Sequence, residues 1–192
     1  MKGLIVANPY AAAGAVGRNW DRLARHVHAS YGSDLDLAFT TARGDATRIV
    51  HDAIAGGADR IIAVGGDGTI NECVNGFAAY GPEVGTQLGV FPAGTGSDLA
   101  RSIGIAKSTE GCSDRLTDIG RVSCVGRDGG QSLRWFLNVA SMGASGLIVD
   151  KVNTTTKRFG GKASFMIGTL KGLARYKNQR IRLTIDDLFD GE

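Results

Sequence analysis

Four short apolar runs, each flanked by turn residues, mark the first half of the chain. They lie at residues 4–7, 35–39, 61–64 and 88–91. Their brevity and their content of Val, Ile, Leu and Phe are typical of strands that are buried on both faces. We therefore expect four strands in one sheet.

Between these runs, apolar residues recur at helical spacing. The three clearest series are Trp20, Leu23, Ala24 and Val27; Ala46, Ile49, Val50, Ala53 and Ile54; and Ile70, Val74 and Phe77. Strands that alternate with helices imply βαβ units. The predicted fold class is therefore α/β, with a Rossmann-like, mostly parallel sheet and helices on both faces. Such sheets bind ligands at the carboxyl ends of their strands.

The pattern changes after about residue 118. Two strands with no helix between them are expected there, and a basic Thr-rich segment, a helix and an alternating strand follow. The expected ranges are 121–125 and 134–141 for the two strands, 162–176 for the helix and 180–185 for the last strand. We predict an α/β domain at residues 1–118 and a partial, β-rich second domain at 119–192, which has too few strands to close a sheet.

Composition fits an ordinary globular protein, with 43% apolar and 21% charged residues among 192. No stretch of about 20 apolar residues is present, so we expect no membrane span, and the opening apolar run is too short for a signal peptide. The three Cys and three His residues lack metal-ligand spacing. We therefore expect neither a disulfide framework nor a zinc site, and a reducing cytoplasm as the setting.

The strongest functional signal follows the third apolar run, where Gly65-Gly66-Asp67-Gly68-Thr69 leads into Ile70-Asn71-Glu72. Glycines at a strand–helix junction let backbone N–H groups approach an anion, and the helix start adds its positive dipole end. Asp67 would repel a bare phosphate, so we expect it to engage Mg²⁺ or to cap a helix that starts at Thr69. The alternative is a tight turn without a ligand, but packing alone rarely requires this sequence.

Three further loops have a similar arrangement. Gly94-Thr95-Gly96-Ser97-Asp98 follows the fourth run, with Ser97 or Asp98 as an alternative helix cap. Asn8-Pro9 follows the first run, and Thr40 ends the second. Because parallel strands present their carboxyl ends at one edge of a sheet, we expect all four loops to outline a single nucleotide site.

Other nucleotide and hydrolase motifs are missing. No G-x-x-x-x-G-K-[ST] occurs, and the two near matches to the dinucleotide fingerprint lack its third small residue. No G-x-S-x-G elbow is present either. These observations disfavour a Walker-type ATPase, a nicotinamide dehydrogenase and an α/β hydrolase.

Together the loops resemble the diacylglycerol-kinase catalytic family, specifically its bacterial lipid kinases, which are similar in turn to sphingosine and ceramide kinases. Asn8-Pro9 with Gly14 resembles the first family motif with looser spacing, and residues 65–72 match the hallmark. Residues 92–98 resemble Pro-Leu-Gly-Thr-Ala-Asn-Asp, with Ser97 where Asn is commoner. Residues 136–143 are similar to the strand that opens the family's second, β-sandwich domain.

The resemblance implies an ATP-dependent lipid kinase that transfers the γ-phosphoryl group to a lipid hydroxyl of diacylglycerol or a similar lipid. It implies ATP and Mg²⁺ as cofactors, with no metal ligand predicted in this chain. The implied catalytic residue is Asp67, because the matching aspartate is assigned as the general base in the sphingosine-kinase branch. The carboxylate that is assigned as the base in the bacterial branch would lie beyond residue 192. The implied nucleotide-binding residues are Asn8, Pro9, Thr40, Gly65, Gly66, Asp67, Gly68, Thr69, Asn71, Glu72, Gly94 and Thr95.

Nine Lys and Arg residues and no acid occupy residues 151–182. This stretch could contact an anionic membrane, which would place the protein in the cytoplasm or peripherally at the inner face of the membrane. The alternative is that residues 162–176 pack on the second domain with solvated charges. We expect no nucleic acid partner, and a homodimer stays open.

Two functional alternatives also stay open. A catalytically incomplete nucleotide-binding fragment would bind ATP without transferring phosphate. An NAD-kinase-like or phosphofructokinase-like phosphotransferase would share the glycine loop but not the motifs at residues 94–98 and 136–143. The lipid acceptor is not defined by the sequence.

Overall fold

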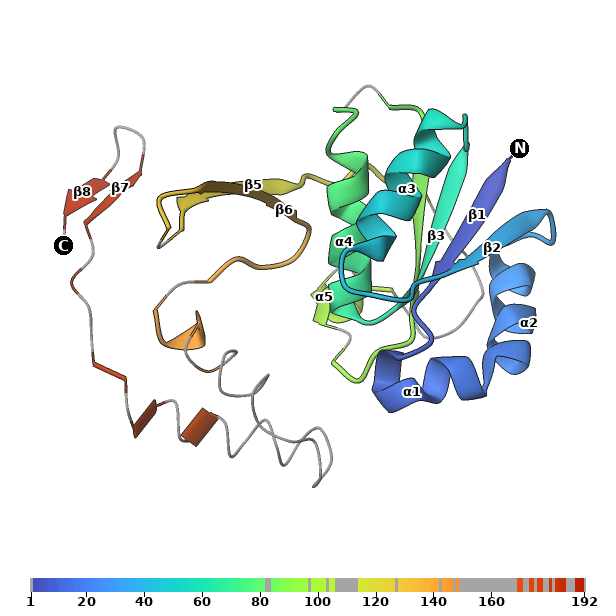
Figure 1. Cartoon of the computed structure of the whole chain (residues 1–192), viewed down its shortest axis with the longest axis horizontal. Helices are drawn as coiled ribbons and strands as arrows, with labels where there is room; N and C mark the ends of the chain where they lie inside the picture. The colour runs from blue at the N-terminus through green and yellow to red at the C-terminus, as the bar shows by residue number, and fades with distance from the viewer. Residues whose placement is uncertain are drawn as a thin grey trace. The chain divides into compact units, whose positions relative to one another are not determined.

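The computed structural model describes most of the first 148 residues and short stretches beyond them (Figure 1). The chain divides into two compact units, Met1–Val139 and Ala140–Glu192. The described ranges are 2–81, 84–96, 98–102, 104–105, 114–126, 128–141, 143–146, 148, 169–170, 173–174, 176–177, 180, 182–185 and 189–191.

The first unit begins with alternating strands and helices and ends in a hairpin. Its strands are β1 (Gly3–Ala7), β2 (Leu35–Phe39), β3 (Arg60–Gly65), β4 (Gln87–Pro92), β5 (Gly120–Val125) and β6 (Gln131–Phe136). Its helices are α1 (Ala11–Arg18), α2 (Trp20–Tyr31), α3 (Asp45–Ala55), α4 (Asp67–Phe77) and α5 (Asp98–Ser102). The second unit contains the antiparallel pair β7 (Leu183–Ile185) and β8 (Phe189–Gly191).

Strands β1 to β4 form one parallel sheet in the order β2-β1-β3-β4. This confirms the predicted α/β class, and each of the four strands lies within one residue of its predicted ends. The chain turns in opposite directions from β1 and from β3. The switch point therefore lies between the carboxyl ends of these two strands, where open α/β sheets bind ligands.

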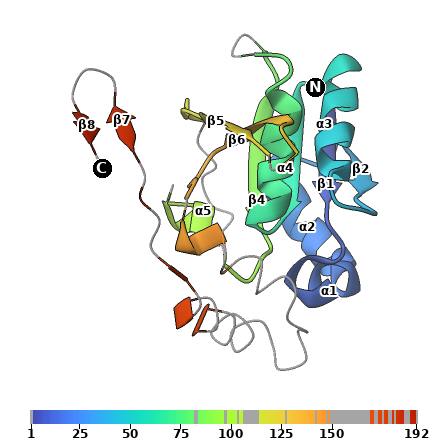
Figure 2. The same cartoon turned by 60° about the vertical axis from the view of Figure 1, so that its left-hand side comes forward.

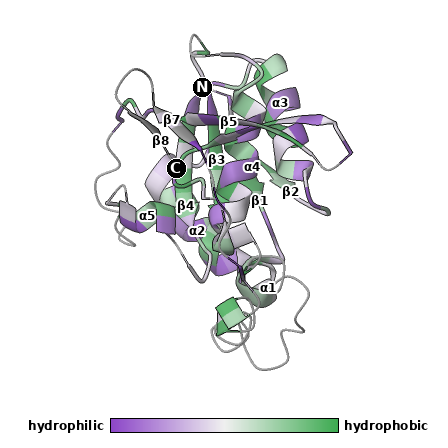
Figure 3. Cartoon of the chain, turned by 90° about the vertical axis from the view of Figure 1, so that its left-hand side faces the viewer, coloured by the Kyte–Doolittle hydropathy of each residue, from purple (hydrophilic) through white to green (hydrophobic). Residues whose placement is uncertain are grey.

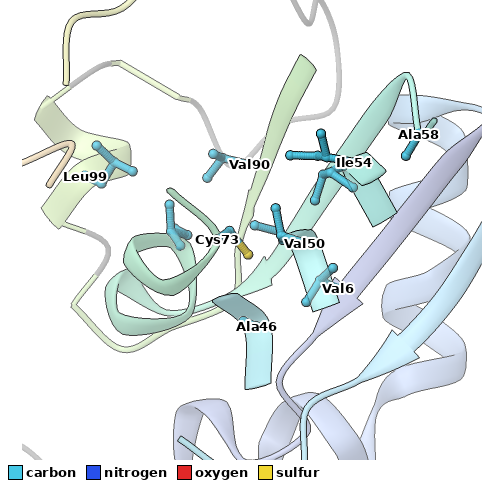
Figure 4. Packing of buried hydrophobic residues seen from close by; sticks show 11 residues of the cluster. Val6, Ala46, Val50, Ile54, Ala58, Cys73, Val90 and Leu99 are labelled. Carbon is cyan, nitrogen blue, oxygen red and sulfur yellow. The ribbon is translucent and has the colours of Figure 1, made fainter. Parts of the chain in front are cut away.

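Helices cover both faces of the sheet, as Figures 1 and 2 show. Helices α3 and α4 pack on one face against Val6, Ile61 and Ala63, and Cys73 lies among the labelled side chains of this cluster in Figure 4. Helices α1 and α2 pack on the other face, against a cluster that includes Ile5. Alternate strand residues thus enter opposite cores, which explains why β1, β3 and β4 are mostly apolar. The edge strand β2 has no buried residue, and Leu37 and Phe39 are 43% and 40% exposed, so the expected burial on both faces was wrong for β2.

The contact between α3 and α4 depends on Gly76. A Cβ atom at this position would lie 2.7 Å from the carbonyl oxygen of Thr47 and 2.7 Å from the Cβ of Val50. Figure 3 shows both helices carrying hydrophobic and hydrophilic residues, as expected of helices with one face on a sheet.

We expect Gly76→Ala to destabilise the fold by about 1–3 kcal/mol, because overpacking would push the two helices apart. Urea unfolding followed by circular dichroism measures this loss. Gly68→Ala is the matched control, since it lies in the same helix and a Cβ there meets nothing within 4 Å. Equal stability of Gly76→Ala and the wild type would contradict the packing role.

Three predicted boundaries were wrong. The last strand, predicted at 180–185, is β7, which begins at Leu183, whereas residues 180 and 182 are not in a strand. The strand predicted at residues 134–141 is β6, which begins at Gln131 and ends at Phe136. Its last residue pairs with Gly120, the first residue of β5, so the hairpin offers no partner beyond it. Helix α4 begins at Asp67 rather than Thr69.

The β5–β6 hairpin groups with the first unit. The side chain of Asn75 in α4 donates to the carbonyl of Trp135 and accepts from its N–H, at 2.9 and 3.1 Å. This link gives a physical reason for the division after residue 139, although the predicted domain boundary near residue 118 stays a prediction. The helix predicted at 162–176 and the basic segment at 151–158 lie largely outside the described residues.

Candidate functional site

Four loops meet in one cleft at the carboxyl edge of the sheet. The cleft has a volume of about 550 Å³. Its described lining comes from the segments after β1, β2, β3 and β4, which supply Asn8, Tyr10, Ala11, Ala12, Thr40, Thr41, Ala42, Arg43, Gly66, Asp67, Gly68, Thr69, Glu72, Gly94, Thr95 and Gly96. Nine of the twelve predicted nucleotide-binding residues are in this lining; Pro9, Gly65 and Asn71 are not.

The two glycine loops touch through their backbones. A Cβ atom on Gly94 would lie 2.5 Å from the Cα of Gly66, and one on Gly65 would lie 2.6 Å from the hydroxyl of Thr69. None of these three glycines has a positive φ angle. Glycine is therefore required at residues 65 and 94 because there is no room for a side chain there. Its small size allows the β3–α4 and β4–α5 junctions to lie against each other.

Gly68 has a different environment. It is exposed in the cleft, and a Cβ atom there would meet nothing within 4 Å. It lies in the first turn of α4, where backbone N–H groups have no partner within the helix. The open space and these donors suit an anionic ligand such as a phosphate group.

Asn8 joins the first loop to the glycine loop across the switch point. Its side-chain nitrogen donates to the hydroxyl of Thr69 at 3.0 Å, and its side-chain oxygen accepts the N–H of Tyr10 at 2.9 Å. Thr69 is only 6% exposed, so this bond is largely shielded from water. Asn8 therefore shapes the floor of the cleft.

The carboxylate of Asp67 serves the neighbouring loop. Its two oxygens accept the backbone N–H groups of Asp98 and Leu99, at 3.2 and 3.0 Å. Of the two roles expected for Asp67, Mg²⁺ binding or a cap on its own helix, the cap was wrong: Gly66 is the N-cap of α4 and no side chain caps it. Asp67 instead caps α5 and so ties the loop after β3 to the loop after β4.

Glu72 makes a similar connection on the other side of α4. One of its carboxylate oxygens accepts the N–H of Ala46 at 3.3 Å, and its carbonyl accepts the hydroxyl of Thr47 at 2.9 Å. Two acidic side chains of α4, Asp67 and Glu72, thus accept N–H groups at the starts of α5 and α3, where negative charge is favourable.

The loop after β2 is held by Asp45. One oxygen of this carboxylate accepts the Thr41 hydroxyl at 2.6 Å, and the backbone N–H groups of Thr41 and Ala42 at 2.8 and 3.0 Å. These bonds, the Thr41 hydroxyl first, lower the pKa of Asp45 from 3.8 to about 2. Their stabilising effect is complete above pH 3.8 and is lost as the pH falls through about 2.

The first loop contains an unusual left-handed turn. Ala12, Ala13 and Gly14 have φ angles of 51°, 55° and 81° inside the span of α1. Such angles cost an alanine roughly 1–2 kcal/mol. Arg18 donates to the carbonyl of Ala13 at 3.1 Å and holds the turn from outside the cleft. This turn accommodates the looser spacing between Asn8-Pro9 and Gly14 that the sequence shows.

Seven of the described lining residues were not among the predicted nucleotide-binding residues, and Arg43 is the charged residue among them. It is exposed and lines the cleft beside Thr41 and Ala42. Its position three residues after the predicted nucleotide residue Thr40 was the available signal. That signal is weak, because an arginine in a loop is usually a solvated surface charge.

The described part of the chain contains no group of three or more His, Cys, Asp or Glu side chains that could hold a metal ion. Cys73 is fully buried in the core, and burial raises the pKa of its thiol to about 12. Cys73 is therefore a packing residue and not a nucleophile. Ser97, predicted as a possible cap, lies outside the described residues.

Residues 2–125 match the family model described as the diacylglycerol kinase catalytic domain. The chain belongs to this family. A diacylglycerol kinase of Bacillus subtilis (strain 168) is 33% identical to it over 164 residues, which make up 84% of this chain and 52% of that protein. A probable lipid kinase YegS-like of Pseudomonas fluorescens is 32% identical over 155 residues, or 81% of this chain and 49% of the relative.

A solved structure of a putative diacylglycerol kinase from Bacillus anthracis is 34% identical, with a TM-score of 0.47 over 55% of this chain and 37% of that one. The chain spans about half the length of the curated relatives it matches. In the part of the chain that the structure describes, no helix has the length and apolarity needed to cross a bilayer.

Proposed function

We propose that the protein is an ATP-dependent lipid kinase that transfers the γ-phosphoryl group to a hydroxyl of diacylglycerol or a similar lipid, and that this chain carries its nucleotide-binding part. The observation that carries the proposal is the single cleft formed by the four loops after β1 to β4. Family membership supports the same activity.

Phosphoryl transfer depends mainly on positioning and on neutralisation of charge. The residues of the cleft suit these tasks. The first turn of α4, opened by Gly68, would bind phosphate through backbone N–H groups. Thr40, which is only 5% exposed, and Thr95 line the cleft from the loops after β2 and β4. Mg²⁺ bound with ATP would neutralise phosphate charge, and the carboxylates nearest to it would be Asp67 and Glu72.

The carboxylate of Asp67 is already engaged within the protein. Both of its oxygens accept backbone N–H groups, which suits a residue that positions the two glycine loops. A carboxylate can accept further bonds, so a second role toward Mg²⁺ is chemically compatible. We propose that positioning is the main contribution of Asp67.

We expect the purified chain to bind ATP, and the longest available form of the protein to transfer the γ-phosphate to a lipid. Calorimetry measures the binding, and radiolabelled ATP with a lipid extract or with NAD measures the transfer. If the protein binds ATP but no form of it transfers the γ-phosphate, its function is nucleotide binding alone. Label in NADP alone would overturn the lipid proposal, and a wild-type chain that binds no ATP would overturn the nucleotide site itself.

A further inference from the structure

The geometry points to Arg43 as the cation that binds the polyphosphate of the nucleotide. This inference rests on the proposed function and adds a binding residue that the family motif at Gly65–Thr69 does not contain. Arg43 lies in the loop between β2 and α3, on the wall of the cleft.

The charge of the cleft lining supports this role for Arg43. Among its described lining residues, Arg43 is the single Lys or Arg, while Asp67 and Glu72 are two acids. The described lining therefore has a formal charge of −1, from one cation and two carboxylates. A polyphosphate would meet a repulsive site without Arg43, whereas a guanidinium pairs well with phosphate oxygens.

The surroundings of Arg43 also support this role. No described carboxylate lies within the 4.0 Å ion-pair distance of its guanidinium. Asp45, the nearest acid along the chain, is engaged by Thr41 and Ala42, and it lies 3.7 Å from Arg48. The loop is thus held rigidly by Asp45, while the charge of Arg43 is left for a ligand.

Other arginines near the four loops are already engaged. Arg18 donates to the carbonyl of Ala13, and Arg101 pairs with Asp98. Neither lines the cleft. Arg43 is therefore the described cation that is best placed to meet a polyanion.

The test compares Arg43→Gln and Arg43→Lys with the wild-type chain. Arg25→Gln is the control, because Arg25 is exposed on α2 and outside the cleft and its loss changes the net charge equally. Affinities for ATP and ADP are measured by calorimetry, and adenosine binding by ligand-observed NMR. Thermal unfolding checks that all variants are folded.

Arg43→Gln is expected to weaken ATP binding about 10- to 100-fold, the range of one charge-assisted hydrogen bond. The loss should be smaller for ADP and absent for adenosine. Arg43→Lys should recover part of the ATP affinity, since it restores charge without the planar fork. Arg25→Gln should bind ATP as the wild type does.

Two results would overturn the inference and leave the proposed nucleotide site in place. If wild type binds ATP and Arg43→Gln binds it equally well, the role of Arg43 is refuted and the proposed nucleotide site stands. If Arg43→Gln weakens adenosine binding as much as ATP binding, Arg43 supports the site without contacting phosphate. Failure of the wild-type chain to bind ATP would instead refute the proposed function together with this inference.

Discussion

Gly94→Val should reduce the affinity of the chain for ATP by about 100-fold or more, equivalent to roughly 2.7 kcal/mol. Any side chain at this position meets the backbone of Gly66, because its Cβ atom would lie 2.5 Å from the Cα of that residue. A backbone cannot rotate away as a side chain can. The two glycine loops would have to separate, which would widen the phosphate site between them.

Isothermal titration calorimetry with ATP measures this effect, and circular dichroism confirms that the sheet is intact. Gly85→Val is the matched control, since a Cβ at that loop glycine meets nothing within 4 Å and Gly85 is outside the cleft. It should bind ATP normally. Wild-type affinity in a folded Gly94→Val variant would show that the contact between the loops does not shape the site.

Asp67→Ala should also weaken ATP binding, through the loop that follows β4. It removes the acceptor for the N–H groups of Asp98 and Leu99, and loss of such a cap costs about 0.5–2 kcal/mol. Helix α5 and the loop that carries Thr95 should then lose their order. We expect ATP affinity to fall about tenfold, and Asp67→Asn to recover part of it, because an amide oxygen can still accept one bond.

Magnesium separates this positioning role from metal binding. If Asp67 acts by holding the loops, its removal weakens ATP binding equally in Mg²⁺ and in EDTA. If it acts as a metal ligand, the loss is confined to the titration with Mg²⁺. Equal ATP affinity of wild type and Asp67→Ala under both conditions would exclude both roles in nucleotide binding.

The strands of the sheet could be predicted closely because each one is marked by its own residues and by those directly next to it in the sequence. Strands buried on both faces must be apolar at nearly every position, and glycines and polar residues mark their ends. The grouping of the four loops followed from the same reasoning, since parallel strands end at one edge. These two rules locate most of the cleft from the sequence.

The connections within the cleft could not be predicted in this way. The cap that Asp67 provides to Leu99 spans 32 positions of the chain, and the pair of bonds between Asn75 and Trp135 spans 60. Neither has a local signature, so the sequence indicated only Mg²⁺ or its own helix as a partner for Asp67, and no partner for Asn75. The importance of Arg43 depended on knowing which of 22 Lys and Arg residues faces the cleft.

The cap on α5 also constrains the order in which the protein assembles. A helix of five residues cannot persist alone in water, since nucleation costs more than so few backbone bonds return. Its partner, Asp67, reaches it only once β3 and β4 are paired and their junctions touch. The loop that contains Thr95 should therefore become ordered late in folding, after the sheet has formed and together with the glycine loop.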